Sequence, residues 1–192
     1  MNSLYEGLRE LCSQRKSVRA FEDKPVPRDL IEKIKDLAST SPYVSGRTNW
    51  DILVVTDPDI IRRMAETVRE ACSDVKKRMR DEFIEVFEQY SENFTFFYHA
   101  QVLFVPLFRV APTFSCMITD PDAEMLQWER DGFVKSISCV AFLIHLAAQS
   151  LGLGSCYMTG PLIAEDELRE ILHVKPGKNI GAIIPVGYPK GA

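Results

Sequence analysis

Apolar positions along the chain follow two spacings, one typical of helices and one typical of buried strands. Steps of three or four residues predict helices at residues 4–11, 30–38, 60–89, 133–151 and 165–172. Short apolar runs predict strands at residues 52–55, 102–108 and 180–186. Because Pro106 lies inside the second run, that strand is expected at a sheet edge or at a bulge. Strands interleaved with longer helices predict a three-layer α/β arrangement.

The segments differ in how their polar residues are distributed. The 133–151 segment is apolar on nearly every side, which predicts a helix in the centre of the core or at a subunit interface, ended by Gly152. The 60–89 segment carries a densely charged surface, which we interpret as a solvated face. Residues 113–124 are expected to form a loop.

Composition and charge narrow the class of protein. A chain of 192 residues with 46% apolar and 26% charged residues predicts one globular domain. The net charge of −4 argues against a general nucleic-acid-binding protein. No apolar run reaches the 18 residues of a membrane span, and no secretion signal is visible. Five scattered cysteines predict reduced thiols in a cytoplasmic protein.

Two short motifs could bind a ligand. Arg15, Lys16, Ser17 and Arg19 place three cations and a hydroxyl within five residues, which suits a phosphate or a carboxylate. A solvated basic loop is the alternative. The second motif, Gly152-Leu153-Gly154, could be a binding turn or only a helix cap. It lacks the strand–GxGxxG–helix order of a dinucleotide site, and the chain has no P-loop sequence.

The sequence shows no amino-acid catalytic machinery. The chain has no GxSxG motif, and its three histidines are too far apart to predict a metal site. Cys156 fits a buried structural thiol better than a nucleophile, and His145 is expected in the core. If the protein is an enzyme, a bound cofactor is therefore expected to carry the chemistry.

Taken together, four segments resemble the FMN-dependent nitroreductase family over residues 1–192, apart from a divergent middle at about 60–130. They are RKSVRAF, SPYVSGRTNWDILVV, LAAQSLGLGSCYMTGPL and IGAIIPVGYPKG. The resemblance implies an α+β fold in three layers, with a mixed and mainly antiparallel central sheet flanked by helices. It also implies a homodimer, with the 133–151 helix in the dimer core, and a variable helical excursion at about 60–100 over the substrate face.

The resemblance also implies a set of cofactor contacts. Arg15, Lys16 and Ser17 would hold the phosphate and ribityl chain of FMN, and Arg19 would lie beside the flavin N1/O2 edge, where negative charge accumulates on reduction. The remaining cofactor-binding positions follow from the other motifs: Gly46, Thr48, Tyr157, Met158, Thr159, Gly160 and Lys190. The main-chain N–H of Thr159 or Gly160 would point at flavin N5. Phe94, Phe97 or Tyr98 would stack on substrate, although simple core packing is an equal alternative.

The function implied is that of an FMN-dependent oxidoreductase. NADH or NADPH would reduce the flavin, and a small-molecule electron acceptor such as a nitroaromatic or quinone would reoxidise it with ping-pong kinetics. One alternative is a specialised flavin reaction such as reductive dehalogenation. Another is a non-catalytic flavin-binding or interaction protein, and a third is a small structural α/β domain. No nucleic-acid or membrane partner is expected.

Overall fold

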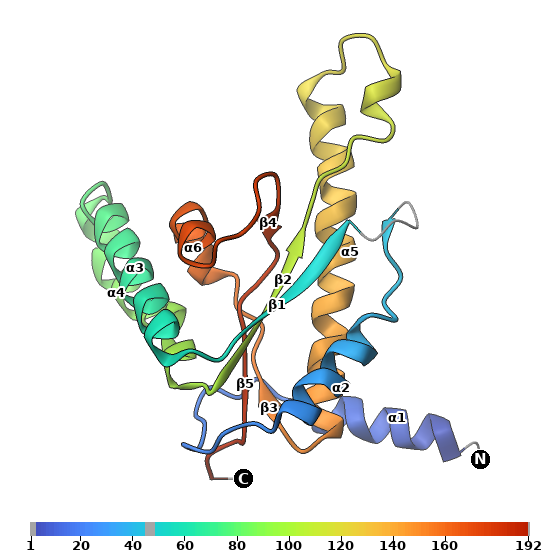
Figure 1. Ribbon diagram of the computed structural model, residues 1–192. Helices are drawn as coiled ribbons and strands as arrows, with labels where there is room; N and C mark the ends of the chain where they lie inside the picture. Colours follow the sequence, from blue (N-terminus) through green and yellow to red (C-terminus); the bar gives the residue numbers. More distant parts are fainter. Residues whose placement is uncertain (1–2, 45–48, 192) are drawn as a thin grey trace.

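The computed structural model describes residues 3–44 and 49–191 and shows a five-stranded antiparallel sheet between helices (Figure 1). The strand order is β1-β2-β5-β3, and β4 pairs with β2 beyond the end of β5. The strands are β1 (Trp50–Val55), β2 (Val102–Phe108), β3 (Gly154–Ser155), β4 (Asn179–Ile180) and β5 (Ile184–Gly187). The expected α+β fold is confirmed.

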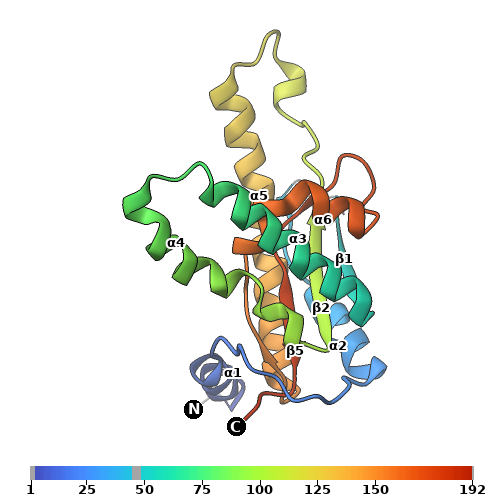
Figure 2. The same cartoon turned by 90° about the vertical axis from the view of Figure 1, so that its left-hand side faces the viewer.

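Helices cover both faces of the sheet (Figures 1 and 2). The α-helices are α1 (Ser3–Gln14), α2 (Arg28–Ala38), α3 (Pro58–Lys76), α4 (Ile84–Ser91), α5 (Ala123–Ser150) and α6 (Glu165–Ile171). The short 3-10 helices are η2 (Asp81–Phe83), η3 (Glu92–Phe94), η4 (Phe96–His99), η5 (Ser115–Met117) and η6 (Gly160–Ala164). The helices α2 and α5 pack on one face of the sheet, and α3 and α6 pack on the other.

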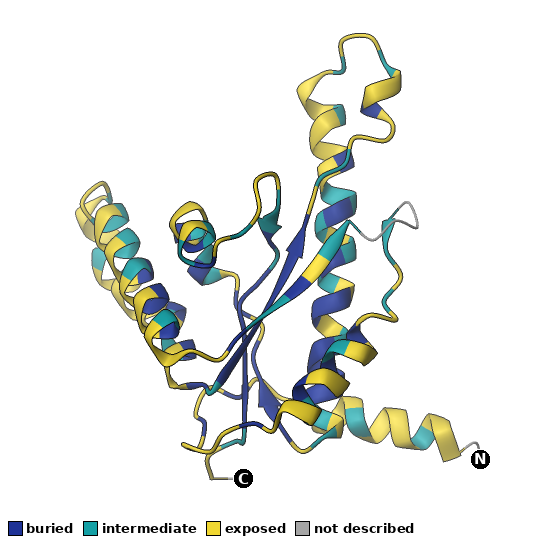
Figure 3. Cartoon of the chain, viewed as in Figure 1, coloured by how far each residue is buried: buried dark blue, intermediate teal, exposed yellow. Residues whose placement is uncertain are grey.

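Strand β2 is buried along its whole length and divides the core into two parts. Phe104 and Phe108 face the cluster that includes Ile34 of α2, whereas Leu103 and Val105 face the cluster of α3 and α6. Alternation of side chains across a strand explains this division. Figure 3 shows burial concentrated on the sheet and on the part of α5 beside it, while α1 contains no buried residue. The sheet therefore forms the centre of the core, and α2, α3, α5 and α6 add buried residues to it, whereas α1 and α4 add none.

Of the two positions expected for Pro106, the sheet edge is wrong, because β2 pairs with strands on both sides. The bulge is confirmed, because two residues of β2 lie opposite three residues of the other segment between the pairs Phe104–Ile184 and Leu107–Ile180. On one side Pro106 lies opposite Ile52 of β1. On the other side the ladder is interrupted between β5 and β4, and the Gly181 amide donates to the Pro106 carbonyl at 2.7 Å. The missing N–H of proline therefore falls where the ladder is already broken. The predicted last strand, 180–186, is divided at the same place into β4 and β5.

The single helix expected over 60–89 is also wrong, because the chain forms an α3–α4 hairpin instead. Cations accumulate where α3 ends, at Lys76, Lys77 and Arg78, and Asp81 begins the next turn. Cations favour a helix C-terminus and acids favour an N-terminus, so this charge pattern marks the break. Lys76 then pairs with Glu88 across the hairpin.

Helix α5 begins ten residues before the predicted start at residue 133. The Asp122 side chain accepts a hydrogen bond from the Met125 amide at 2.8 Å and caps the helix. The first turns carry polar residues, so the apolar pattern alone misses them. Among the described helices, α5 alone has the length and composition to cross a membrane, a property that core helices of soluble proteins share. It packs against α2 and β2.

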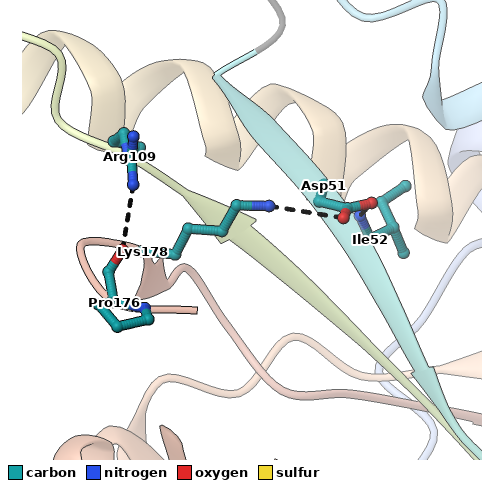
Figure 4. Close-up of polar contacts among 5 residues, drawn as sticks. All are labelled: Asp51, Ile52, Arg109, Pro176 and Lys178. Carbon is teal, nitrogen blue, oxygen red and sulfur yellow. Dashed lines mark hydrogen bonds and ion pairs between the residues drawn. The ribbon is translucent and has the colours of Figure 1, made fainter. Parts of the chain in front are cut away.

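The loop after α6 is fastened to the sheet by two polar contacts (Figure 4). The Arg109 guanidinium donates to the Pro176 carbonyl at 3.1 Å, and the Lys178 ammonium lies 3.5 Å from the Asp51 carboxylate. Gly177, with φ of 79°, allows the turn between them. These contacts join β1 and the end of β2 to the chain that leads into β4 and β5.

A buried carboxylate holds the loop before α5. Glu129 accepts hydrogen bonds from the amides of Thr113 at 2.5 Å and Phe114 at 2.7 Å, and from the amide and hydroxyl of Ser115. The Ser115 hydroxyl, followed by these amides, lowers the pKa of Glu129 to about 2 despite its burial. The ionised carboxylate therefore fixes the loop to the helix.

We expect Glu129→Gln to loosen this loop and to weaken the fold by about 1–3 kcal/mol, because an amide cannot accept from all four donors. Since the pKa of Glu129 is lower in the folded chain than in the unfolded one, its contribution is full above about pH 4.5 and is lost as the pH falls toward 2. Hydrogen exchange at residues 113–115 and denaturation from pH 2 to 7 measure both effects. The exposed Glu124→Gln is the matched control, and unchanged exchange in Glu129→Gln would contradict the assignment.

Candidate functional site

The basic segment Arg15–Arg19 is attached to β3 through its main chain. Ser17 and Ser155 form a parallel bridge, and the Val18 amide donates to the Ser155 carbonyl at 3.0 Å. Gly154 makes this approach possible, because a Cβ at that position would lie 2.7 Å from the Val18 side chain. Gly154 of the second sequence motif therefore allows the two motifs to pair, a role beyond that of a helix cap.

The C-terminal segment joins the same region from another direction. The Lys190 amide donates to the Ala20 carbonyl at 3.0 Å, and Phe21 forms an antiparallel bridge with Pro189. The Glu22 amide donates to the Tyr188 carbonyl at 2.8 Å. Lys190 therefore lies on a segment paired with the residues that follow Arg19.

The cations of this region are not neutralised by the protein. In residues 3–44 and 49–191, Arg15, Lys16, Arg19 and Lys190 form no ion pair with a carboxylate. Arg15 is half-buried, and the other three side chains are exposed or partly exposed. A group of unpaired cations with an adjacent serine hydroxyl fits a phosphate, which accepts charge-assisted hydrogen bonds.

Tyr157 and Met158 continue the chain from β3 beside the basic segment, and η6 begins at Gly160. Met158 exchanges main-chain hydrogen bonds with Ile183, at 3.1 and 2.9 Å, and its side chain is buried. Tyr157 and Thr159, on the opposite side of the segment, are exposed. The main-chain N–H and C=O of Met158 are therefore already used within the protein, and its side chain is buried, whereas Tyr157 and Thr159 offer exposed side chains to a ligand.

Aromatic residues of η3 and η4 support both of these segments. The Phe94 ring lies so close to Gly160 that a Cβ there would be 2.3 Å from it. The Arg19 guanidinium lies 5.9 Å from the centre of the Phe96 ring, a cation–π contact that the sequence analysis did not find. Phe94 is buried, and Tyr90 of α4 meets its ring edge to face at 5.0 Å. These rings position cofactor-binding residues predicted from the sequence.

The other residues expected to contact substrate lie in different surroundings. Phe97 is fully buried in the core and offers no free ring face. Tyr98 is 41% exposed and lines a cavity of about 440 Å³ together with Arg62 and His99. Of the three aromatic residues, Tyr98 is therefore the one with a ring open to a ligand.

A histidine–serine pair lies behind the exposed face. His145 of α5 is buried, and its Nδ1 lies 2.6 Å from the Ser155 hydroxyl. Burial, and then the nearby Arg15 charge, lower the pKa of His145 to about 4, so the ring is neutral at pH 7. Its Nε2 has no hydrogen-bond partner among the described residues. Because the His145 ring is neutral, the positive charge near the site comes from the side chains of the basic segment.

The neighbouring Cys156 is a buried thiol. Burial raises its pKa, although a hydrogen bond from Ser17 and the charges of Arg19 and Arg15 act in the opposite direction. The thiol is therefore protonated at neutral pH, which agrees with a structural role. No cluster of three metal-binding side chains is present in the part of the chain that the structure describes. Gly46 and Thr48 lie outside the described residues.

Comparisons with known proteins place the chain in a family. The profile of the Nitroreductase family matches residues 12–188. The chain is 26% identical over 182 residues to an iodotyrosine deiodinase of Nematostella vectensis, covering 92% of this chain and 64% of that protein. It is 26% identical over 180 residues to a protein of Archaeoglobus fulgidus named as a putative NADH dehydrogenase/NAD(P)H nitroreductase, covering 92% and 82%.

Among solved structures, a BluB-like flavoprotein from Clostridium difficile 630 superimposes with a TM-score of 0.84. It shares 22% sequence identity and covers 96% of this chain and 91% of its own. The chain spans between 59% and 64% of the length of the first four deiodinases it matches. The profile match over residues 12–188 shows that this chain belongs to the nitroreductase family.

Proposed function

We propose that this protein is an FMN-dependent oxidoreductase. The proposal rests mainly on a group of cations that form no ion pair among the described residues: Arg15, Lys16, Arg19 and Lys190. The segments that carry them pair with each other and with β3, which precedes Tyr157. These cations suit the phosphate end of FMN, and the exposed face of Tyr157 and Thr159 suits its ring system. Solved structures of the same fold whose names state bound FMN support this choice of cofactor.

Different residues would bind different parts of the cofactor. Arg15, Lys16 and Ser17 bind the phosphate and ribityl chain, and Lys190 adds a further positive charge. Arg19, supported by Phe96, places a positive charge beside the pyrimidine edge of the ring. The main chain of Thr159 or Gly160 offers a donor to flavin N5. When bound, FMN supplies the transfer of two electrons between a donor and an acceptor.

The first candidate reaction uses NADH or NADPH as donor and a nitroaromatic or quinone as acceptor. It is supported by the name of the Archaeoglobus fulgidus relative. The second candidate is reductive dehalogenation of a halogenated aromatic, supported by the deiodinases that the chain resembles. That reaction consumes two electrons and one proton for each carbon–halogen bond and releases the halide. The two candidates differ in products and not in cofactor.

We also propose a cytoplasmic homodimer. Tyr5 and Leu8 of α1 and Phe142 of α5 are 63%, 53% and 50% exposed, and α1 contacts α5. Burial of these apolar side chains against a second copy would remove them from water. All five cysteines are free, which suits a reducing compartment.

We expect Arg15→Ala to weaken FMN binding about 10- to 100-fold, because a charge-assisted bond to the phosphate is lost. Fluorescence titration of the flavin-free protein measures this affinity. Arg9→Ala, at an exposed arginine of α1 that pairs with Glu6, is the matched control. An Arg15→Ala protein that retains full affinity would show that the phosphate lies elsewhere.

The oxidised protein is expected to absorb near about 450 nm and to bleach when NADH or NADPH is added without oxygen. A flavin peak that does not bleach with either nucleotide would contradict the proposal that NADH or NADPH is the electron donor. It would favour a non-catalytic flavin-binding protein or a different electron donor. A colourless protein that takes up no added FMN would contradict the proposed function itself.

Protein reduced chemically with dithionite, then freed of excess reductant, separates the two candidate reactions. Each acceptor is added alone, a nitroaromatic such as 4-nitrobenzoate or a halogenated phenol such as 3-iodo-L-tyrosine. Return of the flavin absorbance with the first compound only supports the nitroreductase reaction. Return with the second only, together with one iodide for each flavin reoxidised, supports reductive dehalogenation.

For the homodimer, we expect light scattering after size-exclusion chromatography to give twice the chain mass of 21.8 kDa. Phe142→Glu is expected to return the mass to that of one chain, because a charge would be buried in the interface. Phe83→Glu serves as the control, because it changes a similarly exposed ring in the turn between α3 and α4. A wild-type protein with the mass of one chain would overturn the dimer.

A further inference from the structure

His145 is a polar residue near the C-terminal end of α5, the part of the helix that lies beside β3 (Figure 1). Its neighbours on the helix, Ile144, Leu146 and Ala147, are buried and apolar, and His145 itself is only 5% exposed. A buried polar side chain destabilises a fold unless hydrogen bonds compensate for the lost water. The contacts of the ring should therefore explain why a histidine stands at this position.

The His145 ring makes one hydrogen bond among the described residues, to a buried serine. Its Nδ1 lies 2.6 Å from the Ser155 hydroxyl, and Ser155 is 3% exposed. That hydroxyl has no other partner within residues 3–44 and 49–191, so its proton is used only if the hydroxyl donates to Nδ1. The neutral ring is therefore protonated at Nε2 and accepts at Nδ1. A leucine of similar size could not accept this bond.

Ser155 is also the residue of β3 to which the basic segment is attached. Its carbonyl accepts from the Val18 amide at 3.0 Å, and Ser17 forms a parallel bridge with it. On its other edge it pairs with Val186 of β5. Because β3 has only two residues, few main-chain bonds hold it, and a side-chain contact with α5 contributes to its position. The His145–Ser155 bond thus joins α5 to the basic segment.

One charge dominates the surroundings of the His145 ring. Burial, and then the Arg15 guanidinium, lower its pKa to about 4. The other ionisable groups beside it are the Tyr157 phenol, whose ring centre lies 6.1 Å away, and the protonated thiol of Cys156, which follows Ser155. The acids of α1, which also packs on α5, are engaged by side chains of their own helix. An anion bound at Arg15 would therefore offset the main charge that acts on the ring.

We propose that His145 is a positioning residue for the phosphate-binding segment, which it holds in place through the Ser155 hydroxyl and β3. The ring is buried and would touch neither phosphate nor flavin, so it acts on the ligand through the backbone of Ser155 and through the charge of Arg15. The inference rests on the proposed function for the identity of the ligand. For the position of the segment it rests on hydrogen bonds of the chain itself.

Hydrogen exchange in the flavin-free protein tests the positioning directly. His145→Leu removes the acceptor but fills a similar volume, whereas His145→Asn places an amide near the position of Nδ1. We expect exchange of the Val18 amide to rise about 3- to 10-fold in the leucine variant and less than about 2-fold in the asparagine variant. The Ile183 amide, which donates to the Met158 carbonyl at 2.9 Å, should not change and shows that the fold is intact.

Fluorescence titration with FMN measures the effect on the ligand. We expect His145→Leu and Ser155→Ala to weaken binding about 3- to 10-fold and His145→Asn to retain it within about 2-fold. Leucine suits a helix and an apolar interior better than asparagine does, so the leucine variant should be the more stable of the two. A purely structural role would make affinity follow stability instead. Ser150→Ala, at a hydroxyl bonded within the last turn of α5, is the matched control and should change neither affinity nor exchange.

Nuclear magnetic resonance of the histidine rings tests the coupling to the charge of Arg15. The chain has three histidines, and the signal missing from His145→Asn identifies His145. With saturating FMN, its titration midpoint is expected to rise by about half to one pH unit, because the phosphate offsets the Arg15 charge. Riboflavin has the same ring system without the phosphate and should leave the midpoint where it is in the flavin-free protein.

Three results would overturn the proposal. They are unchanged Val18 exchange in His145→Leu, an FMN affinity that follows stability across the variants, and the same His145 midpoint with FMN and with riboflavin. A wild-type protein that takes up no FMN would contradict the proposed function alone. In that case the Val18 exchange still decides whether His145 holds the basic segment.

Discussion

The hydrogen bond from the Val18 amide to the Ser155 carbonyl is the contact on which the candidate site depends. It attaches a short, charged segment to the edge of a buried sheet, and the absence of a side chain at Gly154 allows the two chains to approach. A loop with three cations would otherwise be free to spread in solvent, where its charges repel each other. Fixed to β3, the same cations share a location with the exposed face of Tyr157 and Thr159.

The α3–α4 hairpin is connected to this site through packing as well as through sequence. Phe94 contacts Gly160, and the Phe96 ring contacts the Arg19 guanidinium. The residues that follow α4 therefore touch both the basic segment and the start of η6. Tyr90 of α4 extends the contact outward through Phe94. A shift of α4 would therefore reach the backbone of Gly160 without any change in the residues that face the ligand.

The sequence predicted the local features well, because they depend on neighbouring residues. The cations and hydroxyl of residues 15–19 and the apolar face of α2 are visible in the spacing alone. The contacts of Lys190 with Ala20 and of Phe94 with Gly160 were not predicted from the residues, since they join positions far apart in the chain. Polar residues mark two boundaries that hydrophobic spacing does not show. The cations at Lys76–Arg78 mark the end of α3, and Asp122 marks the start of α5. Pro106 predicted either an edge or a bulge, and only the pairing of β2 with distant strands decides in favour of the bulge.

The pairing of residues 20–22 with residues 188–190 has a consequence for biosynthesis. On a translating ribosome the basic segment emerges early, but the strand that holds it and the lysine that extends its charge emerge about 135 to 170 residues later. Helices and the β1–β2 pair rely on shorter separations and are able to form first. Under the proposed function, cofactor capture is thus a post-translational step, and a chain stalled before residue 188 is expected to be partly folded yet unable to retain a flavin.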